Sequence, residues 1–102
     1  MAVDDPRLAL LRGALERRPA ARVPRTPHAI EAAVALVLRP RESLELLLIK
    51  RAEHESDPWS GHIALPGGRR HPEDEDLLAT AMRETAEETA VPLARIGRVL
   101  GA

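Results

Sequence analysis

Residues 76–89 have the sequence DLLATAMRETAEET and carry the strongest helix signal in the chain. Their apolar positions recur at i, i+4, i+7, i+8 and i+11, which is the spacing of one face of an α-helix. These positions are Leu78, Met82, Thr85, Ala86 and Thr89. The pattern predicts an amphipathic helix that turns this stripe toward a core and ends before Pro92.

The opposite stripe of the predicted helix carries three glutamates. At about 100° per residue, Glu88 lies about 40° to one side of Glu84, and Glu87 lies about 60° to the other. Like charges at these spacings cost about 0.2–0.5 kcal/mol per pair, which a solvated helix face tolerates. A divalent cation reverses the sign of the interaction, and oxygen ligands without His or Cys favour Mg²⁺ or Mn²⁺ over zinc. The stripe is therefore either a solvated acidic face or a metal site.

Residues beside the stripe favour the metal site. Gly67 and Gly68 let the backbone approach a ligand closely. Arg83 stands four residues before Glu87, where its planar fork is placed to hold that carboxylate. A glycine-bounded loop that leads into an acidic helix is a suitable frame for an oxyanion–metal complex.

The N-terminal part of the chain predicts a second helix. Asp5 is a favourable N-cap residue, and Pro6 suits the first helical position. The helix is expected to stop by Pro19, and further prolines at positions 24 and 27 predict an extended linker.

Short strands are predicted between the linker and the acidic helix. Residues 30–38 and 44–50 are apolar and rich in branched side chains, which is typical of two buried strands, with a hairpin as one arrangement. Residues 62–65 predict a third strand that ends at the Pro66-Gly67-Gly68 segment. A further strand-like segment begins over residues 95–100.

Composition excludes several functional classes. The 102 residues contain no cysteine, which rules out disulfide frameworks, zinc fingers and thiol nucleophiles. Fifteen basic and sixteen acidic residues give a net charge of −1, which argues against a broad nucleic-acid-binding face. The longest apolar run, residues 32–38, is far shorter than the roughly 20 residues of a membrane-spanning helix. With no apolar leader at the N-terminus, we expect a single cytoplasmic domain.

The order of glycine, arginine and acids resembles the Nudix box, written G-x5-E-x7-R-E-U-x-E-E-x-G-U. Gly68, Glu75 and residues 83–91 match its positions. Two departures stand out: six residues separate Gly68 from Glu75, and Ala90 occupies the place of the last box glycine. The resemblance covers residues 68–91, and the flanking residues 30–100 also resemble the front half of a Nudix domain.

This resemblance implies a fold and a reaction. Nudix proteins are α/β proteins, α/β/α sandwiches with a mixed sheet, and we expect only the front part of that fold here. Residues 1–27 would form the helix and Pro-rich linker, and residues 28–102 a Nudix domain that is truncated at its C-terminus. The expected reaction is hydrolysis of a pyrophosphate that links a nucleoside to another group, with Mg²⁺ or Mn²⁺ as cofactor.

The resemblance also assigns roles to single residues. Metal ligands would be Glu84, Glu87, Glu88 and the carbonyl of Gly67 or Gly68. Catalytic residues would be Glu84, Glu87, Arg83 and Glu75, with Arg83 orienting the acids and either Glu84 or Glu87 as the base. Substrate-binding residues would be Gly68, Arg51 and His62.

The longer loop resembles the Nudix branch that hydrolyses coenzyme A. Gly61 and residues 66–68 agree with an upstream signature of that branch, whereas Trp59, His62 and Leu65 depart from it. We therefore expect hydrolysis of coenzyme A or an acyl derivative to 3′,5′-ADP and phosphopantetheine. A general nucleoside-diphosphate hydrolase acting on ADP-ribose or dinucleotides, and a truncated non-catalytic remnant, are the alternatives. We expect a small-molecule nucleotide as substrate and neither nucleic acid nor membrane as a partner, and we keep a homodimer as an option.

Overall fold

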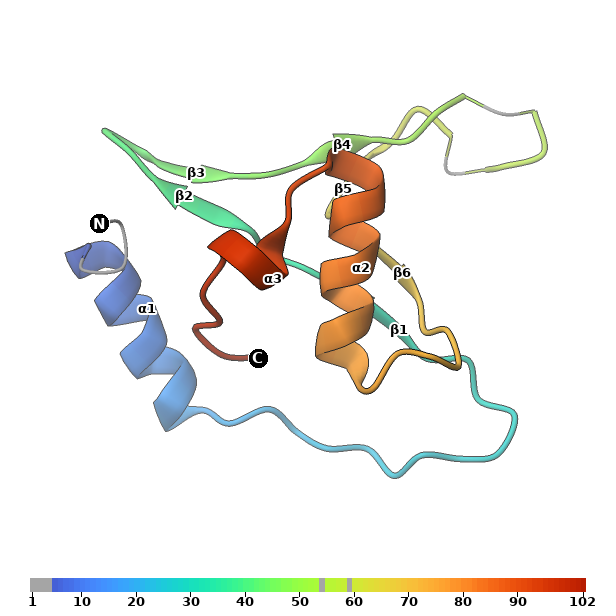
Figure 1. Ribbon diagram of the computed structural model, residues 1–102, viewed down its shortest axis with the longest axis horizontal. Helices are drawn as coiled ribbons and strands as arrows, with labels where there is room; N and C mark the ends of the chain where they lie inside the picture. The colour runs from blue at the N-terminus through green and yellow to red at the C-terminus, as the bar shows by residue number, and fades with distance from the viewer. Residues whose placement is uncertain (1–4, 54, 59) are drawn as a thin grey trace.

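A computed structural model describes residues 5–53, 55–58 and 60–102; Trp59, which departs from the coenzyme A signature, lies outside these residues. The described residues form three helices and six short strands, arranged as in Figure 1. The helices are α1 (Pro6–Arg17), α2 (Leu77–Thr89) and α3 (Leu93–Ile96). The strands are β1 (Ala32–Val34), β2 (Leu38–Pro40), β3 (Leu44–Leu46), β4 (Ile49–Lys50), β5 (Ile63–Ala64) and β6 (Gly67–Arg69). This mixture of helix and strand is consistent with the predicted α/β class.

Helix α1 begins and ends where the sequence predicts. The Asp5 carboxylate accepts a hydrogen bond of 2.8 Å from the Arg7 backbone N–H, which caps the helix. The Arg7 guanidinium donates to the same carboxylate and lowers the pKa of Asp5 to about 2. It also donates to the carbonyls of Arg41 and Glu42, at 2.6 and 3.3 Å, so that α1 is held to the turn between β2 and β3.

The predicted hairpin is present, but its strands are short and exposed. Strands β2 and β3 pair antiparallel, with Leu38 opposite Leu46. The prediction of two continuous buried strands is wrong, because the first segment divides into β1 and β2 and the second into β3 and β4. Leu44 and Leu46 are 38% and 42% exposed. A strand face is buried only where another layer covers it, and helix α2 packs on β1 and β6 rather than on the hairpin.

Strand β6 was not predicted, because its Gly-Gly sequence indicates a turn. It pairs antiparallel with β1, placing Gly67 opposite Val34 and Gly68 opposite Ala33. A Cβ on Gly67 would overlap the Ala33 carbonyl oxygen and lie 2.7 Å from the Val34 Cα, so only glycine fits this approach. Among the described residues the strands form three antiparallel pairs, β1–β6, β2–β3 and β4–β5. The sandwich with a mixed sheet therefore stays a prediction.

Helix α2 packs on β1 and β6 (Figure 1), and of the predicted apolar stripe only Thr85 is among its buried residues. Its buried residues are Thr80, Ala81 and Thr85, whereas Leu78 is 47% exposed. Threonine is buried here because each hydroxyl has a partner: Thr85 Oγ1 donates to the Ala81 carbonyl at 2.7 Å, and Thr80 Oγ1 donates to the carboxylate of Asp74 at 2.9 Å. Hydroxyl pairing of this kind does not appear in a hydrophobic period.

Both ends of α2 have defined caps. The Asp76 carboxylate accepts a hydrogen bond of 2.8 Å from the Ala79 backbone N–H at the start. Ala90 follows the last turn in the left-handed region, with φ of 62°, the conformation that favours glycine at a helix C-terminus. The left-handed conformation explains why the Nudix box has glycine at this position. In this chain Ala90 adopts that conformation under strain.

Residues 95–100 contain no strand, which corrects the prediction made for them. Instead α3 forms one short helix, because the Pro92 carbonyl accepts hydrogen bonds from the Arg95 and Ile96 backbone N–H groups at 2.9 and 3.0 Å. Local bonds of this kind replace the neighbour that a strand would need. None of the helices in the described parts of the chain is long and apolar enough to cross a membrane.

Candidate active site on helix α2

The free edge of strand β6 faces the acidic stripe of helix α2. In the β1–β6 ladder, the Ala35 N–H donates to the Pro66 carbonyl and the Arg70 N–H to the Glu31 carbonyl. Antiparallel pairs alternate, so the backbone groups of Gly67 point away from β1. The Gly67 N–H donates to Glu88 Oε1 at 2.8 Å. This bond ties one predicted metal ligand to the backbone of another.

Gly68 makes room for the carboxylate of Glu84. A Cβ built on Gly68 would overlap Glu84 Oε2, so a larger residue would displace that carboxylate. The Glu84 side chain is only 18% exposed. Burial raises the pKa of Glu84 above its usual range, the Arg83 charge opposes this rise, and Glu87 and Glu88 add to it. Glu84 therefore lies in a confined, negatively charged position.

Arg83 is held by a buried acid that the sequence analysis missed. Its Nε and Nη2 donate to Asp74 Oδ1 and Oδ2, both at 3.0 Å, in a bidentate contact. Its Nη1 donates to Glu87 Oε1 at 3.1 Å, which is the Arg83–Glu87 contact that the helical spacing predicts. Nη2 also donates to the Arg69 carbonyl at 3.0 Å. One guanidinium thus joins the loop before α2, the helix and strand β6.

Asp74 is 7% exposed and accepts hydrogen bonds from four donors. Besides the two from Arg83, the Thr80 hydroxyl and the His71 backbone N–H each donate to it at 2.9 Å. These bonds hold the pKa of Asp74 well below its usual range, with the Arg83 side chain as the largest cause. The same partnership raises the pKa of Arg83.

The structure places Asp74, rather than Glu75, against Arg83. Glu75 is exposed, and among the described residues no hydrogen bond or ion pair joins its carboxylate to Arg83. Five residues separate Gly68 from Asp74, which is the spacing of the box. That spacing was the available signal, but eight residues separate Asp74 from Arg83, so the second spacing of the box, seven residues, fits Glu75. A catalytic role for Glu75 stays a prediction.

A comparison with known families bears on this arrangement. A family model described as the NUDIX domain matches residues 28–102. The chain belongs to the Nudix family. Two similar relatives, each named an uncharacterized Nudix hydrolase NudL, come from Yersinia pestis (strain Pestoides F) and Yersinia pseudotuberculosis serotype O:3 (strain YPIII). Each is 43% identical over 68 residues, which is 67% of this chain and 32% of the relative. The aligned part of the chain thus spans about a third of the length of these relatives.

The predicted substrate-binding residues Arg51 and His62 lie together, beyond the β4–β5 pair. The Arg51 N–H donates to the His62 carbonyl at 2.9 Å, and the Arg51 guanidinium donates to Asp57 at 2.6 Å. Among the described residues, no hydrogen bond or ion pair joins the Arg51 side chain to the α2 glutamates.

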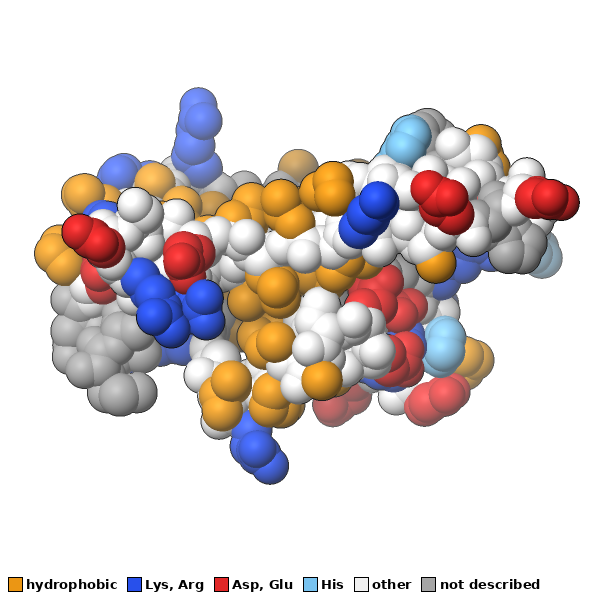
Figure 2. Space-filling view, turned by 90° about the horizontal axis from the view of Figure 1, so that it is seen from above, with side chains coloured by type: hydrophobic (Ala, Val, Ile, Leu, Met, Phe, Trp, Pro, Cys, Tyr) orange, Lys and Arg blue, Asp and Glu red, His pale blue; other side chains and the backbone are white. Residues whose placement is uncertain are grey.

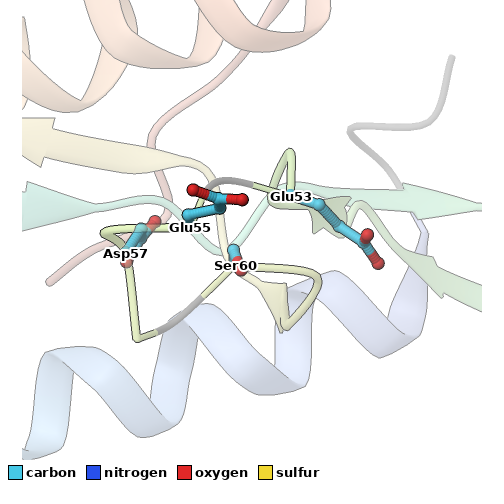
Figure 3. Close-up of a pocket in the computed structure, with 4 residues that line it drawn as sticks. All are labelled: Glu53, Glu55, Asp57 and Ser60. Carbon is cyan, nitrogen blue, oxygen red and sulfur yellow. The ribbon is translucent and has the colours of Figure 1, made fainter.

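The loop that Arg51 enters is acidic. Figure 3 shows a hollow lined by Glu53, Glu55, Asp57 and Ser60. Such a lining repels a diphosphate, and Asp57 already binds the Arg51 guanidinium. The geometry does not bring Arg51 to the Nudix site of this chain.

Nudix enzymes generally use divalent metal ions, and the donor set of this Nudix site suits such an ion. Within the described ranges, no three Asp, Glu or His side chains surround a common point. The three carboxylates instead have separate surroundings: Gly68 for Glu84, Arg83 for Glu87 and the Gly67 N–H for Glu88. All of the donors are hard oxygens, and burial raises the pKa of Glu84, with a smaller contribution from the negative charges of Glu87 and Glu88 that a cation would offset. The residues therefore fit Mg²⁺ or Mn²⁺ in chemistry, and their side chains would need to turn to meet one ion.

Proposed function

We propose that this Nudix protein is a metal-dependent pyrophosphohydrolase that cleaves a nucleoside-diphosphate-linked substrate. The observation that supports the proposal best is the contact of the acidic stripe with the glycine strand, made by Glu88 on Gly67. The Arg83 contact with the Arg69 carbonyl, two residues along β6, supports it from the other side. Together these contacts support a site in which the acidic stripe of α2 lies beside the unpaired edge of β6.

Glu84, Glu87, Glu88 and the Gly67 carbonyl would hold the cation. When bound, Mg²⁺ or Mn²⁺ offsets phosphate charge and lowers the pKa of a bound water. Arg83 fixes the carboxylate of Glu87, and Asp74 fixes Arg83 in turn. Glu84 or Glu87 would accept the proton of the attacking water. Glu84 is the less committed of the two, because its Oε2 lies 3.8 Å from Arg83 Nη1, whereas Glu87 Oε1 lies 3.1 Å from the same atom.

The proposed substrate is coenzyme A or an acyl derivative, giving 3′,5′-ADP and phosphopantetheine. The upstream residues Gly61 and 66–68 support this choice. The loop argument depends on which acid fills the box, because the spacing is six residues to Glu75 and five to Asp74. ADP-ribose and dinucleotides are therefore the main competing substrates.

Several wider features belong to the same proposal. These are a cytoplasmic Nudix domain over residues 28–102 preceded by a helix and linker, a small-molecule nucleotide as the substrate, no nucleic-acid or membrane partner, and a homodimer as an option. A non-catalytic protein is the second candidate. The separate surroundings of the three carboxylates favour it.

A substrate panel tests the proposal. The chain would be assayed with Mg²⁺ and with Mn²⁺ on coenzyme A, ADP-ribose, NADH and diadenosine polyphosphates. We expect hydrolysis at the pyrophosphate, with the highest kcat/KM for coenzyme A. A higher kcat/KM for another member of the panel removes the coenzyme A assignment and leaves the pyrophosphohydrolase. No hydrolysis of any member, by a chain that is shown to be folded, favours the non-catalytic candidate.

A further inference from the structure

We propose that Arg70 is a positioning residue for the α2 site, acting through the loop that carries Asp74. This inference rests on the proposed function. Arg70 directly follows β6, and its side chain is 23% exposed. Neither the helical period nor the Nudix box singles out this residue.

The Arg70 guanidinium binds the main chain of the loop. Its Nη2 donates to the carbonyls of Asp74 and Glu75 at 3.2 and 3.0 Å, and its Nε approaches the Asp74 carbonyl at 3.4 Å. These are consecutive carbonyls just before the cap of α2, so one planar group fixes the backbone on which the Asp74 carboxylate is carried.

The other end of Arg70 is anchored to the residue that precedes β1. Its Nη1 donates to Glu31 Oε1 at 3.2 Å, and its backbone N–H donates to the Glu31 carbonyl at 2.9 Å. Arg70 therefore connects the base of the β1–β6 ladder to the loop. A continuous series of contacts runs from Glu31 through Arg70 and Asp74 to Arg83 and Glu87.

The geometry gives Arg70 a specific task. Both carboxylate oxygens of Asp74 accept hydrogen bonds from Arg83, and they do so only while the Asp74 backbone keeps its present orientation. Without Arg70, the carbonyls of residues 74 and 75 lose these donors and the loop gains freedom to move. The bidentate contact between Asp74 and Arg83 then weakens, so Arg83 no longer fixes the orientation of the Glu87 carboxylate. Lysine at position 70 has one ammonium group and does not reproduce the fork.

Arg25 provides a matched control. It also binds Glu31 Oε1, at 3.1 Å, but its side chain is 69% exposed, and among the described residues no hydrogen bond or ion pair joins it to the loop over residues 70–76. An exposed ion pair of this kind contributes little. Arg25→Gln and Arg70→Gln thus each remove one guanidinium partner of the Glu31 carboxylate, but only Arg70→Gln also removes the hydrogen bonds to the loop.

The test is the exchange rate of the Arg83 Nε–H proton, measured by NMR in the full chain, together with Mn²⁺ affinity. We expect Arg70→Gln to speed this exchange about tenfold and to weaken Mn²⁺ binding by a similar factor, whereas Arg25→Gln changes each by less than about twofold. In an Asp74→Asn background, Arg70→Gln should add nothing, because it acts through Asp74. Unchanged Arg83 exchange in Arg70→Gln, or additive losses in the double variant, overturn the inference.

Kinetics separate this inference from the proposed function. In an active chain, Arg70→Gln should lower kcat about tenfold and leave the KM for the nucleotide within about twofold. If the wild-type chain hydrolyses nothing but Arg83 exchange responds as expected, the proposed function fails and the positioning role stands. If Arg70→Gln does not fold, Arg70→Lys is the second variant, with an intermediate exchange rate expected and a wild-type rate contradicting the inference.

Discussion

Two antiparallel strand pairs of equal length behave differently in this molecule. The β1–β6 pair is covered by α2 and adjoins a network of hydrogen-bonded side chains, with Thr80 and Thr85 fully buried. The β2–β3 pair carries leucines that remain exposed, and Figure 2 shows hydrophobic side chains across this face of the molecule. Among the described residues, the buried hydrophobic core consists of Leu8 and Ala81, each 8% exposed.

This difference indicates which interactions hold the candidate site in one arrangement. The α2–β6 region is held by polar contacts that converge on Asp74 and Arg83 rather than by an apolar core. Buried polar groups specify one arrangement when every donor and acceptor is paired, and no buried side-chain N or O atom in the described residues lacks a partner. Changes in this region should therefore have large effects, and changes in the hairpin small ones.

The largest effect is expected from Asp74→Asn, which replaces one of the two carboxylate oxygens that accept hydrogen bonds from Arg83. A partner that orients metal-binding residues typically contributes about 10- to 100-fold to metal affinity or activity. We expect Mn²⁺ affinity and turnover to fall within that range. Glu75→Gln, one position along in an exposed side chain, should cost less than about twofold. Equal losses in the two variants would indicate that Glu75, rather than Asp74, fills the acidic position of the Nudix box.

Substitutions of Gly67 and Gly68 in β6 allow a comparison within the α2–β6 region. Gly67→Ala drives a Cβ into the backbone of β1 and should destabilise the chain by about 1–3 kcal/mol in chemical denaturation. Gly68→Ala meets only the mobile end of the Glu84 side chain, so it should weaken Mn²⁺ binding and change the free energy of unfolding by less than Gly67→Ala does. The reverse order of stability losses would show that the β1–β6 approach is not tight.

Ala90→Gly should stabilise the chain. Ala90 has φ of 62°, where an L-residue costs about 1–2 kcal/mol and glycine costs little. Part of this gain is offset by the greater entropy of glycine in the unfolded chain, which leaves about 0.5–1 kcal/mol. Thermal and chemical unfolding measure it, and a destabilised Ala90→Gly variant would argue against the left-handed cap at the end of α2.

Glu45→Gln gives the smallest expected effect, because it lies in the exposed hairpin. It breaks the ion pair with Arg39, whose N–O distance is 2.7 Å, but the two side chains are 66% and 45% exposed. Such pairs contribute about 0–1 kcal/mol. A loss well above that range would mean that the hairpin contributes to the stability of the fold as strongly as the α2 region.

The sequence predicted what local patterns encode. The Asp5 cap and Pro6 located α1, and the helical period located α2 to within one residue at its start. The Arg83–Glu87 contact followed from helical spacing alone. These features depend on residues close together in the chain, so no tertiary information was needed.

The remaining features depend on distant partners. The buried position of Asp74 exists only because Arg83, nine residues later, supplies the compensating charge. Strand β6 exists because it pairs with β1, whose backbone approaches Gly67 closely. The buried face of α2 is rotated from the predicted stripe because paired threonine hydroxyls replace apolar side chains. None of these pairings is visible in a hydropathy or propensity pattern.

The central claim is that the acidic stripe beside β6 binds a divalent metal ion. Its most direct test is a calorimetric Mn²⁺ titration of the wild-type chain and of Glu88→Gln, with Glu45→Gln as the matched control. We expect saturable binding by the wild type and by Glu45→Gln, and binding at least about tenfold weaker by Glu88→Gln. Equal binding by all three proteins, or none by the wild type, would show that the stripe is a solvated acidic face.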